Sequence, residues 1–164
     1  MKKIIDVHTG EVKAGRKNAI LKSSPIGSCV VIVAYNSGKK VGALAHVMLP
    51  GSSPNRNTPQ RTKYATDAID VMINRMTRLG AGKDDIEVCL VGGGNVLRRK
   101  DDTICKDNIA SVIESLKKKR IKIRAKAVGG TKRRNLFFDV EEGNISYTEG
   151  SGEKKLLWKG VAKT

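Results

Sequence analysis

The chain has 164 residues, enough for one domain with a hydrophobic core, and no run approaches the ~20 apolar residues that span a bilayer. Its 32 Lys and Arg residues against 16 Asp and Glu residues give a formal net charge of +16, which favours acidic partners. Aromatic residues are only 4% and no nucleic-acid-binding motif is visible, so we do not expect nucleic acid to be the main partner. Residues 1–6 predict a first strand and lack the apolar region of a signal peptide, so we expect a cytoplasmic protein without membrane insertion.

The next elements form a predicted β-hairpin. Two apolar runs, at residues 29–34 and 41–49, flank a polar, glycine-containing turn at residues 36–39. If the turn is centred between its second and third residues, the numbers of opposed residues sum to 75 and Cys29 lies opposite His46. Opposed residues share a face, with Cβ atoms ~4.5–5.5 Å apart. A thiol and an imidazole at that separation can form a nucleophile–base pair.

Cys29 and His46 each have a purely structural interpretation as well. Cysteine is among the most buried residue types, and a histidine on an apolar strand is commonly a hydrogen-bonded core residue. A register slip of one residue would place the two side chains on opposite faces. We expect them on adjacent antiparallel strands, pointing to the same face.

The middle of the chain alternates between loop, helix and strand patterns. Residues 51–59 are rich in Ser, Pro and Asn, which predicts a loop beside the site that could cover or recognise a substrate. Residues 61–79 carry one apolar stripe at helical spacing. Residues 86–91 predict a buried strand that ends at Gly92–Gly94. We expect a close backbone approach at these glycines, because they lack the pattern of a phosphate-binding loop.

The last part of the chain predicts a second helix and further strands. Residues 107–116 are amphipathic, and the basic residues 117–120 follow at the C-terminal end, where cations suit the helix dipole. Residues 121–125 alternate as a half-buried strand does. Residues 136–140 and 145–148 flank a second hairpin turn. Strands mixed with two helices predict a single α/β or α+β domain.

The cysteines and histidines argue against a metal site. Cys29, Cys89 and Cys105 are an odd number without short spacing, unlike a disulfide framework or a set of zinc ligands. With His8 and His46 as the two histidines, we expect no metal, and no motif indicates a cofactor.

Two segments around the predicted pair are specific, Ile26-Gly27-Ser28-Cys29-Val30 and Ala45-His46-Val47-Met48-Leu49-Pro50. With them, the chain closely resembles the chemoreceptor glutamine deamidase family CheD. The similarity covers about Asp6 to Ser146 in the family's order, and it includes Gly10-Glu11-Val12, Lys63-Tyr64-Ala65, Gly92-Gly93-Gly94, Asn108-Ile109, Gly129-Gly130 and Arg133-Arg134. The resemblance implies a CheD-like fold over residues 1–164, an α/β domain of mixed, largely antiparallel sheets covered by helices.

The resemblance also implies a catalytic triad. Cys29 would attack a glutamine side-chain amide to form a thioester, with ammonia released, and His46 would be the general base. The family's third member is a threonine six positions before the cysteine, and Ser23 stands there in this chain. Serine keeps a hydroxyl and a backbone carbonyl that can orient the imidazole. Pro25 replaces a usual glycine and Ala127 a common acid, which could retune activity or partner binding.

The partners implied by the resemblance are the Glu-rich cytoplasmic helices of chemoreceptors, as substrate, and a CheC-like phosphatase. Basic side chains near the hairpin suit an acidic helix electrostatically. We predict substrate or partner contacts at Arg56, Arg61, Arg133 and Arg134.

Two other functions stay open on the sequence. The chain could be a non-catalytic chemotaxis adaptor, although the presence of both Cys29 and His46 argues against it. It could also be a cysteine hydrolase of receptor methyl esters, since the same thioester chemistry serves. Release of methanol instead of ammonia would identify the hydrolase.

Overall fold

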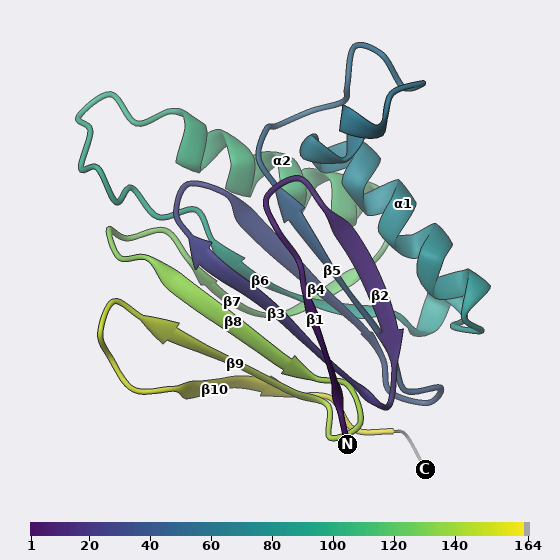
Figure 1. Cartoon of the computed structure of the whole chain (residues 1–164). Helices are drawn as coiled ribbons and strands as arrows, with labels where there is room; N and C mark the ends of the chain where they lie inside the picture. Colours follow the sequence, from purple (N-terminus) through teal and green to yellow (C-terminus); the bar gives the residue numbers. More distant parts are fainter. Residues whose placement is uncertain (163–164) are drawn as a thin grey trace.

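The computed structural model describes residues 1–162 and consists of two five-stranded sheets with two α-helices (Figure 1). The first sheet has the order β1-β3-β8-β9-β10 and contains β1 (Lys3–Asp6), β3 (Ala19–Ile26), β8 (Arg134–Asp139), β9 (Asn144–Glu149) and β10 (Lys155–Lys159). The second has the order β2-β5-β4-β6-β7 and contains β2 (Val12–Arg16), β4 (Val30–Asn36), β5 (Val41–Val47), β6 (Glu87–Gly92) and β7 (Lys122–Val128).

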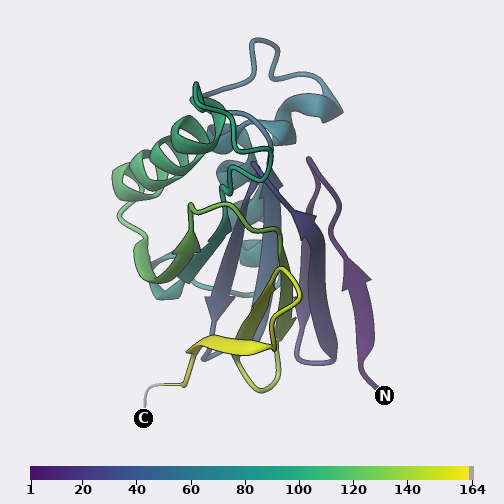
Figure 2. The ribbon, with the colours of Figure 1, turned by 90° about the vertical axis from the view of Figure 1, so that its left-hand side faces the viewer.

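The strand pairings are antiparallel except for two parallel pairs, β1 with β3 and β6 with β7. The helices α1 (Ala65–Arg78) and α2 (Ile104–Lys118) cover the outer face of the second sheet (Figures 1 and 2). This confirms the predicted class of mixed, largely antiparallel sheets covered by helices. The predicted domain range extends over residues 163–164, which lie outside the described residues.

Strand β4 divides its side chains between two hydrophobic cores. Val30, Ile32 and Ala34 face the helices, whereas Val31, Val33 and Tyr35 face the first sheet. This alternation is what a strand produces when both faces of its sheet are covered. A strand of this kind leaves no position for a hydrated polar side chain, since all seven of its residues are buried.

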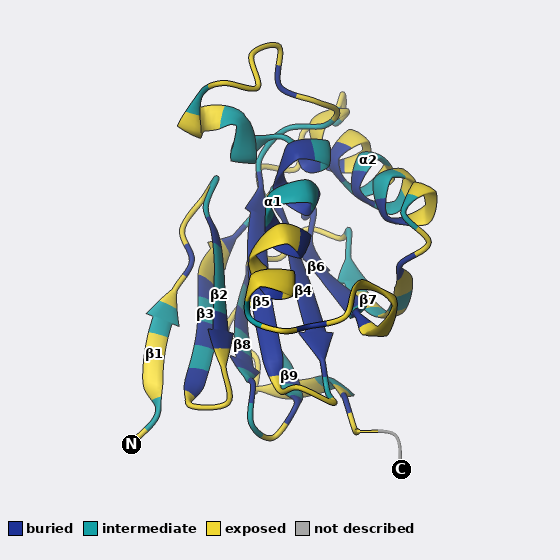
Figure 3. Cartoon of the chain, turned by 90° about the vertical axis from the view of Figure 1, so that its right-hand side faces the viewer, coloured by how far each residue is buried: buried dark blue, intermediate teal, exposed yellow. Residues whose placement is uncertain are grey.

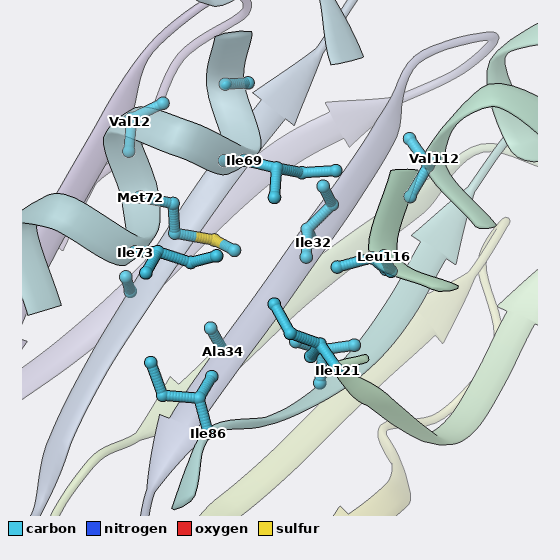
Figure 4. Packing of buried hydrophobic residues seen from close by; sticks show 14 of the residues in the cluster. Val12, Ile32, Ala34, Ile69, Met72, Ile73, Ile86, Val112, Leu116 and Ile121 are labelled. Atoms are coloured by element: carbon cyan, nitrogen blue, oxygen red, sulfur yellow. The ribbon is translucent and has the colours of Figure 1, made fainter. Parts of the chain in front are cut away.

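The outer core forms where the two helices meet the sheet. Ile69 and Met72 of α1 point toward Ile32 on β4, and Val112 and Leu116 of α2 approach from the other side (Figure 4). The opposite faces of both helices are exposed (Figure 3). The apolar stripe predicted from sequence is therefore the packed face of each helix. Among the helices of residues 1–162, none is long and apolar enough to cross a membrane.

The predicted hairpin is present, but its register differs from the prediction. The turn takes four residues, 37–40, and Val31 lies opposite His46, so the numbers of opposed residues sum to 77 and not to 75. The prediction that Cys29 directly faces His46 is therefore wrong. The reason is the position of the turn: the loop expected at residues 36–39 occupies residues 37–40, where Lys40 adopts a left-handed φ of 51°, so its centre lies one residue later than assumed from sequence.

The first predicted helix is shorter than its pattern suggested. Pro59–Lys63 form a separate 3-10 turn, and Tyr64 is extended, with φ −96° and ψ 141°, so α1 begins at Ala65. The sequence analysis also missed β2, β3 and β10. These strands lack a long apolar run: β2 and β3 mix buried with half-buried or exposed residues, and β10 has no buried residue.

The close approach of the two sheets generates a stability prediction at Gly42. A Cβ atom at Gly42 would overlap the ring of Phe138 and come within 3.0 Å of Val140 Cγ2. We expect Gly42→Ala to lower the free energy of unfolding by about 1–3 kcal/mol in urea denaturation, as overpacking of a core does. In the matched control Gly38→Ala, the new Cβ would meet Asn36 Oδ1 at an ordinary 3.6 Å. Equal unfolding midpoints for the two variants would contradict tight packing between the sheets.

Candidate active site

Cys29 lies in a bend directly before β4 and is half-buried, whereas His46 lies in β5 and is 2% exposed. The backbone of His46 is hydrogen-bonded to the two residues that precede β2. Its N–H donates to Glu11 O at 3.0 Å, and its carbonyl accepts from Gly10 N at 2.8 Å. The observed register differs from the predicted one by two residues. Because this difference is an even number, position 29 lies on the same face as Val31, which is opposite His46. If the pairing continued two residues beyond Val31, Cys29 would lie diagonally across from the histidine on that face.

The imidazole of His46 is oriented by a hydroxyl from the other sheet. Ser23 Oγ, on β3, lies 2.8 Å from His46 Nδ1 and 2.7 Å from the carbonyl oxygen of Val7. A hydroxyl has one hydrogen, and the carbonyl can only accept, so the Ser23 hydroxyl donates to Val7 O. Ser23 Oγ must then accept a hydrogen bond from Nδ1–H. This assigns the proton of neutral His46 to Nδ1 and leaves a lone pair on Nε2.

The second ring nitrogen, Nε2, is buried and has no hydrogen-bond partner among residues 1–162. A buried acceptor without a partner costs free energy, and such atoms in native proteins are few. A basic lone pair held in the correct tautomer is what a general base needs. The sequence analysis left open whether the hydroxyl or the carbonyl of Ser23 would orient the imidazole, and in the structure the hydroxyl contacts it.

Burial shifts the two proposed catalytic groups toward their neutral forms. It lowers the pKa of His46, against a smaller raising effect of the Val7 carbonyl. Burial raises the pKa of the Cys29 thiol, and a hydrogen bond from the backbone N–H of Cys29 itself partly offsets this rise. Near neutral pH the Cys29 thiol and the His46 imidazole are therefore both mainly in their neutral forms.

The other two cysteines are poor nucleophiles. Burial raises the pKa of Cys89 to about 12, and burial together with Asp102 raises that of Cys105 to about 11. Both side chains are also at most 4% exposed. Cys29 is the most accessible of the three thiols.

The glycine run forms the platform under the nucleophile. A Cβ at Gly92 would overlap the carbonyl oxygen of Cys29, and Gly93 N donates to that same oxygen at 2.7 Å. Gly94 N donates to Gly27 O at 2.9 Å. Gly92 and Gly93 have φ angles of 122° and 65°, which side chains disfavour. The predicted close backbone approach at these glycines is confirmed.

Two of the four predicted arginine contacts are occupied within the chain. Asp67 of α1 is fully buried, and its carboxylate accepts from Ser53 N at 2.6 Å and from Arg56 Nε at 3.0 Å. Arg61 Nη1 lies 3.6 Å from the same carboxylate, and Arg56 also reaches Asp70 at 3.1 Å. These contacts fix the loop after β5 onto α1.

The two arginines after the second glycine run, Arg133 and Arg134, differ in burial. Arg134 is 5% exposed, and its Nη1 donates to Gly92 O at 3.1 Å, so it supports the glycine platform from inside. Arg133 is exposed. Gly129 N donates to Gly92 O at 3.0 Å, which places this loop against the platform under Cys29.

Asn108 belongs to the segments that carry the family resemblance, but sequence reasoning assigned it no role at the site. It lies near the N-terminal end of α2, is fully buried, and donates from Nδ2 to Ser28 O at 3.2 Å and to Met48 O at 3.0 Å. The available signal was a polar residue one helical turn before Val112, on the apolar face of the predicted helix. Val7 gave no signal, because its role rests on its backbone carbonyl.

A cavity of about 750 Å³ lies away from this cluster. It is bounded by β1, β2 and the end of α1, with Ile5, Lys13 and Arg75 in its lining. Neither Cys29 nor His46 lines it. The chemistry of the nucleophile and the base, and not the size of a cavity, identifies the candidate site.

The orientation of His46 generates a prediction on thiol reactivity. We expect iodoacetamide to label Cys29 first. The labelling rate should rise with pH toward a midpoint above the ordinary thiol pKa of 9.0, because burial raises the Cys29 pKa.

The Ser23 hydroxyl generates a second prediction. We expect Ser23→Ala to reduce catalytic turnover by about 10²-fold, since the Nδ1–H then loses its buried acceptor. The control Ser37→Ala removes a half-buried hydroxyl in the hairpin turn, which donates to Val161 O at 3.1 Å and lies away from His46. Mass spectrometry of labelled peptides and ammonia release are the readouts. Equal labelling of the three cysteines, or equal turnover in both serine variants, would contradict the assignment.

Comparison with known proteins gives a consistent result. The CheD family model, described as CheD chemotactic sensory transduction, matches residues 48–149. A "Probable chemoreceptor glutamine deamidase CheD" from Chlorobium luteolum is 37% identical over 154 residues, which span 94% of this chain and 77% of the relative.

Two further relatives are similar along nearly their whole length. A "Probable chemoreceptor glutamine deamidase CheD" from Methanococcus maripaludis is 34% identical over 93% of this chain and 99% of its own. The "Chemoreceptor glutamine deamidase CheD" of Thermotoga maritima is 30% identical over 98% of this chain and 100% of its own. The matches to the Chlorobium and Thermotoga relatives cover 94% and 98% of this chain, whereas the family-model match begins at residue 48, after Ser23, Cys29 and His46. On this similarity and on its architecture, the chain belongs to the CheD family.

Proposed function

We propose that the chain is a chemoreceptor glutamine deamidase that hydrolyses glutamine side chains to glutamate and ammonia. The observation that carries this proposal is the Val7–Ser23–His46 hydrogen-bond relay, which leaves Nε2 as a buried base on β5, next to the strand that follows Cys29. The names of the relatives supply the substrate class. We further propose that residues 1–164 act as one catalytic domain in the cytoplasm.

The first half of the reaction forms a thioester. His46 Nε2 accepts the Cys29 thiol proton, and Sγ attacks the carbonyl carbon of the glutamine amide. The carbonyl electrons move to oxygen, and the Cys29 N–H is the donor we assign to that oxyanion. When the intermediate collapses, the C–N bond breaks and His46 gives its proton to the departing nitrogen, which leaves as ammonia.

The second half returns the enzyme to its starting state. His46 removes a proton from water, and the hydroxide attacks the thioester carbon. The S–C bond breaks, the thiolate takes the proton back from His46, and glutamate is released. Because the His46 pKa is lowered by burial, the neutral base is present throughout the neutral range. No step requires an oxidant or reductant.

The catalytic proposal predicts the effect of removing either group. We expect Cys29→Ala and His46→Ala each to abolish deamidation of a receptor cytoplasmic fragment, with the double variant little worse than either, because residues of one catalytic unit are non-additive. Intact mass is the measurement, since replacing NH₂ by OH adds about 1 Da per glutamine. Near-normal turnover in His46→Ala would remove the base assignment. Methanol release without the mass gain would instead support the alternative that the chain hydrolyses receptor methyl esters. If the native chain showed no turnover, the non-catalytic adaptor would be the remaining hypothesis.

The excess positive charge supports electrostatic steering of an acidic substrate or partner, including a CheC-like phosphatase. Of the four arginines predicted to make contacts, Arg133 is exposed beside the glycine platform, whereas Arg56, Arg61 and Arg134 make contacts within the chain. We therefore assign the principal steering contact to Arg133.

Charge reversal tests this assignment. We expect Arg133→Glu to lower kcat/KM for the receptor fragment and to flatten its dependence on salt, because the Debye length falls from ~10 Å at 0.1 M to ~3 Å at 1 M. The control Lys39→Glu makes the same charge change in the exposed turn at the opposite end of β4. Both variants should keep the native kcat. Equal salt slopes for the two variants would show that the position of Arg133 does not matter.

A further inference from the structure

Asn108 connects the two halves of the candidate active site. Its Nδ2 donates to Ser28 O, in the bend before β4, and to Met48 O, just after β5. The orientation of the amide follows from these partners. The reversed amide would set Oδ1 against two carbonyl oxygens, which are all acceptors. One fully buried side chain thus holds both the segment that carries the nucleophile and the strand that carries the base.

The first of these bonds fixes more than a loop. Ser28 O belongs to the same peptide group as the Cys29 N–H, and a trans peptide is planar with its C=O and N–H pointing in opposite directions. Fixing the carbonyl therefore fixes the direction of the N–H. The next carbonyl, Cys29 O, is fixed by Gly93 N at 2.7 Å. Both peptide groups of Cys29 are held in place.

The Cys29 N–H itself is available. It donates to no backbone carbonyl among residues 1–162, whereas neighbouring groups of the bend are paired. It lies close enough to its own Sγ to oppose the rise of the thiol pKa. An unpaired donor beside the attacking atom is the arrangement that stabilises an oxyanion.

We propose that Asn108 is a positioning residue that aims and polarises the Cys29 N–H for the oxyanion of the acyl-transfer step. The inference rests on the proposed deamidase function and assigns one more residue to that site. A hydrogen bond to Ser28 O draws electron density through the amide, and such chains of hydrogen bonds strengthen one another. Asn108 acts through the peptide and does not touch the substrate.

A purely structural role for Asn108 makes a different prediction. Alkylation of Cys29 by iodoacetamide forms an S–C bond at a saturated carbon and develops no oxyanion. Acylation by p-nitrophenyl acetate does develop one: the Sγ–C bond forms, the C–O bond breaks, and nitrophenolate leaves. A residue that aims the N–H affects acylation and spares alkylation, whereas a residue that merely supports the fold affects both or neither.

The experiment compares Asn108→Ala and Asn108→Asp with the native chain. Aspartate matches the volume of asparagine but replaces the donating NH₂ by an oxygen. Val112→Ala is the matched control, because it removes packing from a fully buried residue one turn along α2 and leaves the Asn108 contacts intact. For each variant we measure the melting temperature, Cys29 alkylation, the nitrophenolate burst, and kcat and KM with a receptor fragment. Cys29→Ala gives the background.

We expect both Asn108 variants to lower the burst rate and kcat by at least about 10-fold, approaching the ~10²-fold loss typical of a missing oxyanion donor. Alkylation and KM should stay within about twofold of native, and Val112→Ala should lower only the melting temperature. Native-like burst rates in both Asn108 variants, or equal losses in acylation and alkylation, would overturn the proposal. Asn108→Ser, which keeps one donor, replaces Asn108→Ala if that variant does not fold. A native chain that shows the burst but releases no ammonia would refute the proposed function and still test Asn108.

Discussion

The burial of His46 on a doubly covered sheet is the constraint on which the rest of the site depends. The imidazole is 2% exposed, so water cannot satisfy its ring nitrogens. The Ser23 hydroxyl takes one nitrogen, and its own hydrogen is committed to the Val7 carbonyl. The tautomer is thereby set by the fold and not by the solvent. What remains is a single basic atom in a low-dielectric environment, which favours the neutral thiol and imidazole over the ion pair that a proton transfer between them would form.

Three layers cooperate to build this arrangement. The first sheet supplies Ser23, the second supplies His46 and the strand that follows Cys29, and α2 supplies Asn108. The glycine run at the end of β6 lets the bend at Cys29 approach the sheet without a side chain between them. No single layer contains all parts of the candidate site. The catalytic geometry therefore depends on the same tight packing that stabilises the two cores.

The sequence was informative where a pattern is local and uninformative where a contact is distant. The hairpin, both helices and the glycine approach followed from periodicity and turn residues, and the family motifs pointed to Cys29, His46 and Ser23. The register was missed because the turn lies one residue later than expected and ends at Lys40 in a left-handed conformation, for which lysine carries no signal. The burial of Arg134 was missed because its partner is the carbonyl of Gly92, 42 residues earlier. Asn108 stood in a family segment, but its role was not visible because its two partners, the carbonyls of Ser28 and Met48, lie 80 and 60 residues earlier in the chain.

The pairing of β3 with β8 has a consequence for how the protein is made. Ser23 is opposite Leu136, so the ladder that carries the third triad residue joins the beginning of the chain to a segment near its end. Such non-local pairing is slow to form, because a long loop must close before any contact repays the entropy. During synthesis the N-terminal half, with the proposed nucleophile Cys29 and the proposed base His46, emerges first. The serine that orients the base cannot be locked in its final sheet until residues 134–149 have left the ribosome, so a nascent or truncated chain would hold a thiol without a correctly set base.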